Sequence, residues 1–298
     1  MLEIYAIVYQ FGKVASTSIV ATLDDLDGII AVQCHFLGEA ALAGVIPTIT
    51  GANTSHYFFK NELGQFVENV RITRRMNRIR AGKNNERLLV ISLARNPLDW
   101  IRSSIVQDIE GYFPVLKSLL NKQNIETTDD QDIIVKGLAH IITTMTLILN
   151  REGGVDACLE RMPNNADAVF ENSSFAADMD SRRIFHMILR PFNWFEKHFQ
   201  KALNMHPNQM KRVHGVHELS DRNANYVVIR YEDLDQALPA YLKRHDMPTF
   251  TELKRENISG VKPFAKECED AFKTPEAQIL DNLFCDTRYA ATFGYSNT

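Results

Sequence analysis

Four short runs of apolar residues set the pattern of the chain. Each run is rich in β-branched or aromatic residues at consecutive positions, which is typical of a strand buried on both faces of a sheet. The runs lie within residues 3–9, 29–37, 88–94 and 226–234, the last of which ends in Tyr-Glu-Asp-Leu. Because helix-like segments lie between them, the pattern predicts an α/β fold with a central, mainly parallel sheet flanked by helices.

Helical periodicity dominates the middle and the end of the chain. Apolar residues recur at helical spacing over 129–150, before two glycines interrupt the pattern. The segment 181–203 predicts a further helix with a junction near Pro191, and Thr274 with Pro275 suits the start of the last helix. The sequence therefore predicts long helices outside the sheet.

The loop after the first apolar run carries the first candidate chemistry. It reads Gln-Phe-Gly-Lys-Val-Ala-Ser-Thr-Ser and leads into a predicted helix. The first amides of a helix lie at the positive end of its dipole, so a strand, a tight loop and a helix form a cradle for a phosphate-like anion. Lys13 adds a positive charge, and Ser16, Thr17 and Ser18 add hydroxyl donors. An ordinary turn with Ser16 as N-cap is the alternative.

The order of residues in this loop differs from that of a Walker A loop. The pattern Gly-x-x-x-x-Gly-Lys-Ser/Thr places the lysine directly before the hydroxyl residue, whereas Lys13 comes three positions before Ser16. This difference disfavours an ordinary ATP or GTP site.

A second group of polar residues follows the run 88–94. Arg95 comes directly after this predicted strand, at the carboxyl end where open α/β sheets bind ligands. Asn96 and Pro97 suit the N-cap and the first position of a helix, and Ser103 lies about two turns into it.

These motifs, in this order, resemble those of the sulfotransferases that use 3′-phosphoadenosine 5′-phosphosulfate (PAPS). The segment Lys13–Ser18 is similar to the first loop of the heparan sulfate 2-O-sulfotransferase branch, and Arg95 and Ser103 have the family's eight-residue spacing. A Tyr-Glu-Asp-Leu segment late in the chain is also frequent in these domains. With Cys34–Leu37 and Phe192–Phe195, the loop is also similar to microbial capsular polysaccharide synthesis proteins. The resemblance implies a P-loop-like sulfotransferase fold.

The resemblance also implies a cofactor and roles for the residues that bind it. PAPS would be the donor and adenosine 3′,5′-bisphosphate the product, with no metal. Lys13 would neutralise charge on the bridging oxygen, and Arg95 and Ser103 would hold the 3′-phosphate. The residues expected to bind the cofactor are Gly12, Lys13, Val14, Ala15, Ser16, Thr17, Ser18, Arg95 and Ser103.

His35 lies near the end of the run 29–37, at the sheet edge where Lys13 and Arg95 are also expected. The resemblance implies that a histidine at this place takes the proton from the acceptor hydroxyl, and imidazole, with an ordinary pKa of about 6.5, suits a general base. Several sulfotransferases use a glutamate instead, which makes Glu39 the substitute. The alternative for His35 is a partly buried side chain bonded to a backbone carbonyl.

An arginine-rich segment precedes the run 88–94. Ile72, Met76 and Ile79 fall at i, i+4 and i+7, which predicts an amphipathic helix with arginines on its outer face. Arginine forks match carboxylates and sulfates, so an acidic or sulfated glycan fits this face. A solvated helix face is the alternative. The residues expected to bind the acceptor are Glu39, Arg74, Arg75 and Arg78.

Composition limits the class of protein. With 298 residues, 45% of them hydrophobic, the chain is expected to form a single domain over 1–298, with a helical cap or insertion within about 110–220. The net charge of -4 disfavours a nucleic-acid-binding surface. No run approaches the roughly 20 apolar residues of a membrane span, and no signal-peptide pattern opens the chain. The four scattered cysteines are expected to be reduced thiols, so we expect a cytoplasmic protein.

Together these features favour a sulfotransferase that moves a sulfuryl group from PAPS to a hydroxyl of a carbohydrate or polysaccharide. A nucleotide-dependent kinase-like enzyme is one alternative, which the position of Lys13 disfavours. A noncatalytic nucleotide- or glycan-binding protein with the same fold is another. No closely spaced set of histidines and cysteines predicts a metal site.

Overall fold

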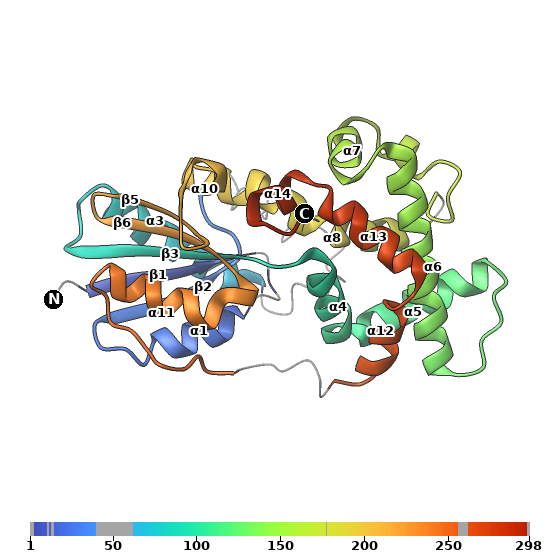
Figure 1. Ribbon diagram of the computed structural model, residues 1–298, viewed down its shortest axis with the longest axis horizontal. Coiled ribbons are helices and arrows are strands. Elements are labelled where there is room, and N and C mark those ends of the chain that lie inside the picture. The colour runs from blue at the N-terminus through green and yellow to red at the C-terminus, as the bar shows by residue number, and fades with distance from the viewer. Residues whose placement is uncertain are drawn as a thin grey trace. The chain divides into compact units, whose positions relative to one another are not determined.

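The computed structural model describes residues 3–10, 12, 15–39, 62–176, 178–255 and 262–296. The chain divides into two compact units, one that contains the sheet and one that is helical (Figure 1). The first unit comprises Met1–Arg95 and Trp194–Asn257, and the second comprises Asn96–Asn193 and Ile258–Thr298. The sequence predicted a helical cap or insertion within about 110–220; the helical unit begins earlier and includes the last helices of the chain.

The first unit is an α/β layer structure with one six-stranded mixed sheet. The strand order is β2-β1-β3-β6-β5-β4; the first four neighbours are parallel, and β5 is antiparallel to both β6 and β4. The strands are β1 (Glu3–Tyr9), β2 (Ile29–Cys34), β3 (Glu86–Ala94), β4 (Lys211–Val213), β5 (Val216–Asp221) and β6 (Ala224–Arg230). The helices of this unit are α1 (Ser16–Leu23), α3 (Glu62–Arg80), α10 (Gln200–Leu203) and α11 (Leu234–Arg244).

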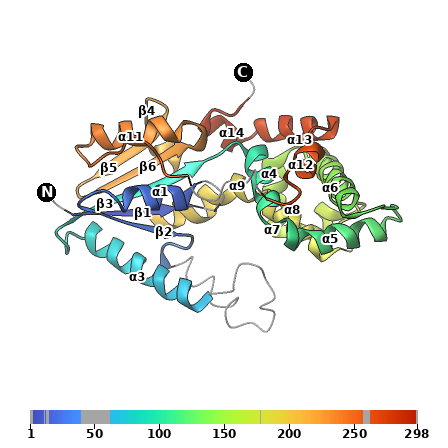
Figure 2. The ribbon, with the colours of Figure 1, turned by 90° about the horizontal axis from the view of Figure 1, so that it is seen from below.

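The sheet is covered on both faces, which explains its apolar runs. Parallel crossover connections are right-handed, so a chain that runs from β1 to β2 and then back past β1 to β3 places its helices on opposite faces. In Figures 1 and 2, α1 and α11 cover one face of the sheet and α3 covers the other. Residues 4–9 of β1 and 88–94 of β3 are buried throughout, as strands sandwiched between helices are.

An aromatic cluster closes one face of the sheet. The ring of Tyr9 lies 4.9 Å from that of Trp194 and 6.3 Å from that of Phe199, the last residue of a π-helical turn. Phe195 is also buried, whereas Phe192 packs against aromatic rings of the helical unit. Phe192, Trp194, Phe195 and Phe199 are therefore all core side chains.

The second unit is built around the long helix α6. Its helices are α4 (Pro97–Gln107), α5 (Ile109–Lys122), α6 (Asp130–Glu152), α7 (Val155–Phe170), α8 (Met179–Ile188), α9 (Arg190–Trp194, whose last residue belongs to the first unit), α12 (Ala265–Ala271), α13 (Pro275–Cys285) and α14 (Arg288–Phe293). A Cβ on Gly137 of α6 would lie 2.8 Å from the Cβ of Leu116 on α5. Glycine therefore lets these two helices approach closely.

Local helix signals are confirmed in this unit. Asn96 caps α4 with Pro97 at its first position, Asp129 caps α6 and Thr274 caps α13. The predicted helix at 181–203 is interrupted at Leu189, and Pro191 lies in the first turn of α9, where a helix tolerates a residue without an N–H.

Helix α6 is the one helix of the described residues that is long and apolar enough to cross a membrane. Within its most apolar 18-residue window, 61% is buried inside the protein. That burial matches the core helix of a soluble protein.

The four cysteines are free thiols, as the sequence predicted. Cys34, Cys158 and Cys268 are buried, and Cys285 is half-buried. Burial raises the pKa of the Cys34 thiol to about 12, so this group stays protonated and inert.

Candidate functional site

Several of the predicted site residues follow the carboxyl ends of the parallel strands. Tyr9 pairs with Cys34 at the ends of β1 and β2, and Ala94 pairs with Arg230 at the ends of β3 and β6. The strand order turns back between β1 and β3, and ligands of open α/β sheets bind at such a switch point. The loop after β1 and the residues that follow β2 and β3 therefore share the edge at which ligands are expected (Figure 1).

The loop after β1 has an unusual approach to its helix. Gly12 and Ala15 both have positive φ, of 92° and 60°, and Ala15 is the N-cap of α1. The alternative with Ser16 as N-cap is wrong, because α1 starts at Ser16 and no side chain caps it. A left-handed alanine is sterically unfavourable by roughly 1–2 kcal/mol, and such strain is concentrated at ligand-binding loops.

The hydroxyl residues of the loop occupy the first turn of α1. The first intrahelical hydrogen bond runs from the Ile19 N–H to the Ala15 carbonyl at 3.0 Å, so the amides of residues 16–18 lie in the turn that can face an anion. Ser16 and Ser18 are buried, and Thr17 is exposed. The predicted ligands Lys13 and Val14 lie outside the described residues.

Helix α1 is fixed from behind by the segment that follows α11. The hydroxyl of Thr22 donates to the Ser18 carbonyl at 2.7 Å and accepts the Lys254 N–H at 2.9 Å. Lys254 also forms an ion pair with Asp25. These contacts hold α1 in place and so keep its first turn at the sheet edge.

His35 is held through both of its ring nitrogens. Its Nδ1 lies 3.1 Å from the Gln10 carbonyl oxygen, and its Nε2 lies 2.9 Å from the side-chain Nε2 of Gln33. Because a carbonyl only accepts and the Gln33 amide nitrogen only donates, Nδ1 carries the proton and Nε2 has a lone pair. The backbone contact considered as the alternative for His35 is present, and it leaves the ring in the tautomer that a base with a reactive Nε2 requires.

The chain after His35 packs closely against two helices, α3 and α10. Gly38 has a φ of 87°, its N–H donates to the Thr73 hydroxyl at 3.2 Å, and a Cβ there would lie 3.1 Å from the Cα of Ala202. Only glycine fits both this backbone conformation and this approach. Glu39, the substitute base, follows directly and is exposed.

Arg95 lies over an aromatic ring at the end of β6. Its guanidinium carbon is 4.4 Å from the centroid of the Tyr231 ring, which corresponds to a cation–π contact. Arg95 is the last residue of the first unit, and Ser103 lies half-buried in α4 of the helical unit. The two members of the predicted 3′-phosphate pair therefore belong to different units.

The arginine-rich segment forms α3, with Ile72, Met76 and Ile79 buried as predicted. Arg75 does not belong to the open face: it forms ion pairs with Glu86 and, at 3.5 Å, with Glu3, and its guanidinium carbon lies 4.1 Å from the centre of the Tyr5 ring. The hydrogen bond from Arg75 lowers the pKa of Glu86. Arg75 therefore ties α3 to the starts of β1 and β3.

Arg74 and Arg78 are exposed, in contrast to Arg75. Helix α3 contacts the carboxyl edge of the sheet through Asn69, whose Oδ1 lies 3.1 Å from the Cys34 Sγ, and reaches the amino edge through Arg75. Arg78 comes almost one turn after Arg75. The exposed side chains of Arg74 and Arg78 therefore lie between the middle of α3 and the amino edge of the sheet, which is opposite the edge that holds His35.

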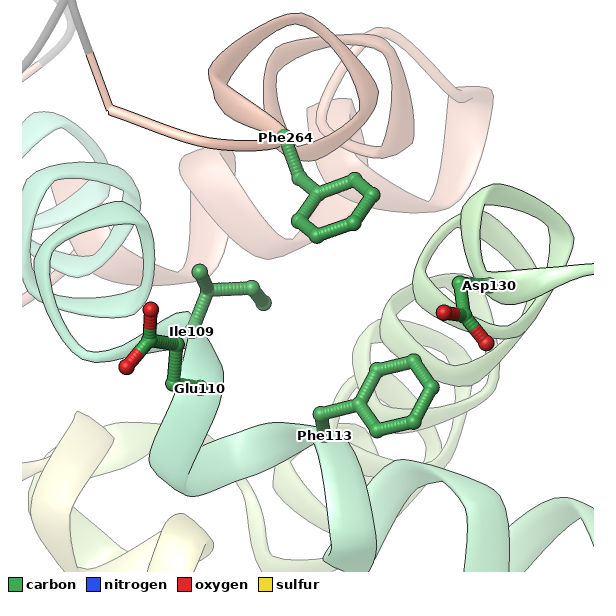
Figure 3. A pocket seen from close by; sticks show the side chains of 5 residues that line it. All are labelled: Ile109, Glu110, Phe113, Asp130 and Phe264. Carbon is green, nitrogen blue, oxygen red and sulfur yellow. The ribbon is translucent and has the colours of Figure 1, made fainter.

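The helical unit has a separate cavity of about 260 Å³ (Figure 3). It is lined by Ile109, Glu110, Phe113, Asp130 and Phe264. Its two carboxylates belong to the first turns of α5 and α6, where negative charge complements the helix dipole. None of the predicted site residues lines this cavity.

Sequence reasoning missed two residues of the site, Gln10 and Gln33. Gln10 meets His35 only because β1 and β2 are paired in this register, whereas Gln33 lies two positions before His35, a spacing that places alternate side chains of a strand on one face. Among the described residues, no group of three or more His, Cys, Asp or Glu side chains could hold a metal ion. Comparisons of this chain with protein families, with curated proteins and with solved structures found no match.

Proposed function

We propose that this protein is a PAPS-dependent sulfotransferase that modifies a hydroxyl group of a carbohydrate. The observation that carries the proposal is the state of His35, whose ring is fixed with an unprotonated Nε2. It lies at the sheet edge that also holds the loop before α1 and Arg95. A base, an anion cradle and an arginine at one switch point support group transfer from an anionic nucleotide.

The loop fits the 5′ end of PAPS. Apart from its chain neighbours, no atom of the described residues lies within 4 Å of the position that a Cβ on Gly12 would occupy. The first turn of α1 offers backbone amides and the hydroxyls of Ser16, Thr17 and Ser18. In this proposal Lys13 keeps the role that the resemblance implies, as a charge beside the bridging oxygen.

Arg95 and Ser103 are assigned to the 3′-phosphate. The Tyr231 ring packs against one face of the Arg95 guanidinium, which limits its rotation.

When bound, PAPS supplies a sulfuryl group on a phosphate leaving group. The Nε2 atom of His35 takes the proton of the attacking hydroxyl. Nδ1 keeps its own proton and donates it in a hydrogen bond to the Gln10 carbonyl. That carbonyl also stabilises the imidazolium that forms. Gln33 has to move its amide away from Nε2 before the hydroxyl can approach.

The position of α3 favours a polymeric acceptor. A glycan whose reacting hydroxyl lies at His35 meets Arg78 only if it extends along α3 toward the opposite sheet edge. A strand of seven residues spans about 23 Å, so several sugar units are needed for this contact. We place this activity in the cytoplasm, where four free thiols remain reduced.

The proposed function is tested by transfer of ³⁵S from labelled PAPS to a panel of acidic and neutral polysaccharides. Labelled polymer that forms with the parent protein and not with His35→Ala supports the sulfotransferase. The contact of Gln33 with Nε2 favours a second candidate, a noncatalytic nucleotide- or glycan-binding protein, because it covers the base. Tight binding of PAPS without transfer to any member of the panel would favour that candidate.

A further inference from the structure

The side chain of Gln10 is an unexplained polar group at the proposed site. It is fully buried, with a relative exposure of 0%, and neither its Oε1 nor its Nε2 has a hydrogen-bond partner in the described structure. A buried amide that has lost water without gaining a partner is unfavourable, and native proteins contain few such groups. Gln10 therefore calls for a partner that is bound only part of the time.

The position of Gln10 identifies that partner. Gln10 directly follows β1 and is the first residue of the loop that leads into α1. Its carbonyl oxygen accepts a hydrogen bond from His35 Nδ1 at 3.1 Å. Its backbone therefore lies beside the proposed base, whereas Arg95 follows β3. In the proposed reaction, the oxygens nearest to the base belong to the group that is transferred.

We propose that the Gln10 carboxamide binds the transferred sulfuryl group, with its N–H donating to a sulfuryl oxygen. This inference rests on the proposed function and makes Gln10 a residue that distinguishes PAPS from adenosine 3′,5′-bisphosphate. A neutral amide suits this place because it donates hydrogen bonds to an anionic oxygen without a charge that would hold the product.

The central test compares the binding of PAPS and of the bisphosphate by calorimetry. Gln10→Met keeps the length of the side chain and removes both polar atoms. A hydrogen bond to a charged group contributes about 1.5–3 kcal/mol, so Gln10→Met should weaken PAPS binding about 10- to 150-fold and leave bisphosphate binding unchanged. Gln10→Glu should weaken PAPS binding at least as much, because a carboxylate repels the anion, and it provides a second variant if Gln10→Met does not fold.

Ser92 provides a matched control. Its Oγ is a second fully buried atom without a partner in the described structure, but it lies inside β3 rather than at the strand end. Ser92→Ala should raise the unfolding midpoint, as Gln10→Met should, and leave both affinities unchanged.

The outcomes separate this inference from the proposed function. If Gln10→Met raises the unfolding midpoint but binds PAPS as the parent does, a buried water satisfies the amide and the inference is overturned. An equal loss of affinity for PAPS and for the bisphosphate would also overturn it. In both cases, binding of the bisphosphate by the parent protein would leave the proposed function standing. A parent protein that binds neither nucleotide overturns both.

Discussion

The Nδ1 atom of His35 lies 3.1 Å from the carbonyl oxygen of Gln10, which precedes it by 25 positions in the chain. This contact joins the ends of two neighbouring parallel strands and fixes the imidazole as the tautomer with a lone pair on Nε2. The side-chain Nε2 of Gln33 lies 2.9 Å from the Nε2 of His35 and donates a hydrogen bond to that lone pair. The geometry of a base thus follows from the pairing of β1 with β2.

Removal of the His35 side chain should slow the transfer reaction and preserve binding of the bisphosphate. A general base contributes typically 10²- to 10⁴-fold, so His35→Ala should lower turnover by about that factor with unchanged affinity for the bisphosphate. The ³⁵S transfer assay and calorimetry measure the two quantities. His214→Asn, at an exposed turn with positive φ, is the control and should retain full turnover. Full turnover in His35→Ala would instead make Glu39 the candidate base.

Gln33 should act through His35, and the pH profile should reveal it. In Gln33→Glu a carboxylate beside the imidazole favours its protonated form. Since the base is active only when neutral, the rising limb of kcat against pH should move to higher pH, with turnover reduced near pH 7 and recovered near about pH 9. Gln33→Met, which uncovers Nε2, should increase acceptor-independent hydrolysis of PAPS by about 2- to 10-fold. A profile that is identical in all three proteins would show that Gln33 plays no part.

Arg95 should provide the preference for a 3′-phosphate. Arg95→Ala should weaken bisphosphate binding about 10- to 150-fold and leave AMP binding nearly unchanged. Tyr231→Leu should cost about 2- to 5-fold because the cation–π contact is lost, whereas Tyr231→Phe keeps it. Arg87→Ala is the control, since Arg87 lies at the other end of β3 and contacts the His245 carbonyl. A bisphosphate affinity that Arg95→Ala leaves intact would remove Arg95 from the site.

The exposed arginines of α3 should affect binding of the acceptor, whereas Arg75 should affect stability. Reversal of the exposed Arg74 and Arg78 to glutamate should raise the KM for a polymeric acceptor and flatten its salt dependence, without a change for a short oligosaccharide. Steady-state kinetics with acceptors of graded length measure both effects. If the KM for long and short acceptors stays the same, this face of α3 is only solvated.

Arg75 should matter for stability instead. Its contact lowers the pKa of Glu86 from the ordinary value of 4.5, so the ion pair stabilises the fold above that pH and its contribution is lost as the pH falls through the lower, folded-state pKa. Glu86→Gln should reduce the free energy of unfolding by about 1 kcal/mol near pH 7 and by much less near about pH 2. Urea unfolding at the two pH values measures the difference. Glu252→Gln, at an exposed position, should show no change at either pH.

Local signals in the sequence predicted much of the fold. The run 3–9 is apolar at every position after Glu3 because β1 is covered on both faces, and it became a strand with the same bounds. Asn96, Asp129 and Thr274 cap their helices with their own side chains, so neighbouring residues suffice to predict those starts. Pro191 likewise marks the break at which α9 begins.

The remainder depends on residues that meet only in the folded chain. Periodicity places Arg75 at the margin of the apolar stripe of α3, but its partners Glu3 and Glu86 come from two different strands. Gln10 has no motif, and only the register of β1 with β2 brings its carbonyl to His35, whereas the contact of Gln33 is local, two positions before His35. The division between Arg95 and Asn96 also has no local signal, because strand, loop and helix follow one another there without a linker.

Calorimetry with adenosine 3′,5′-bisphosphate, AMP and ATP tests the central claim most directly, because it requires no knowledge of the acceptor. A PAPS-dependent sulfotransferase should bind the bisphosphate at least about 10-fold more tightly than AMP, since the 3′-phosphate gains hydrogen bonds from Arg95 and Ser103. It should bind ATP more weakly than the bisphosphate. Equal affinities for the bisphosphate and AMP, or a clear preference for ATP, would contradict the proposed function.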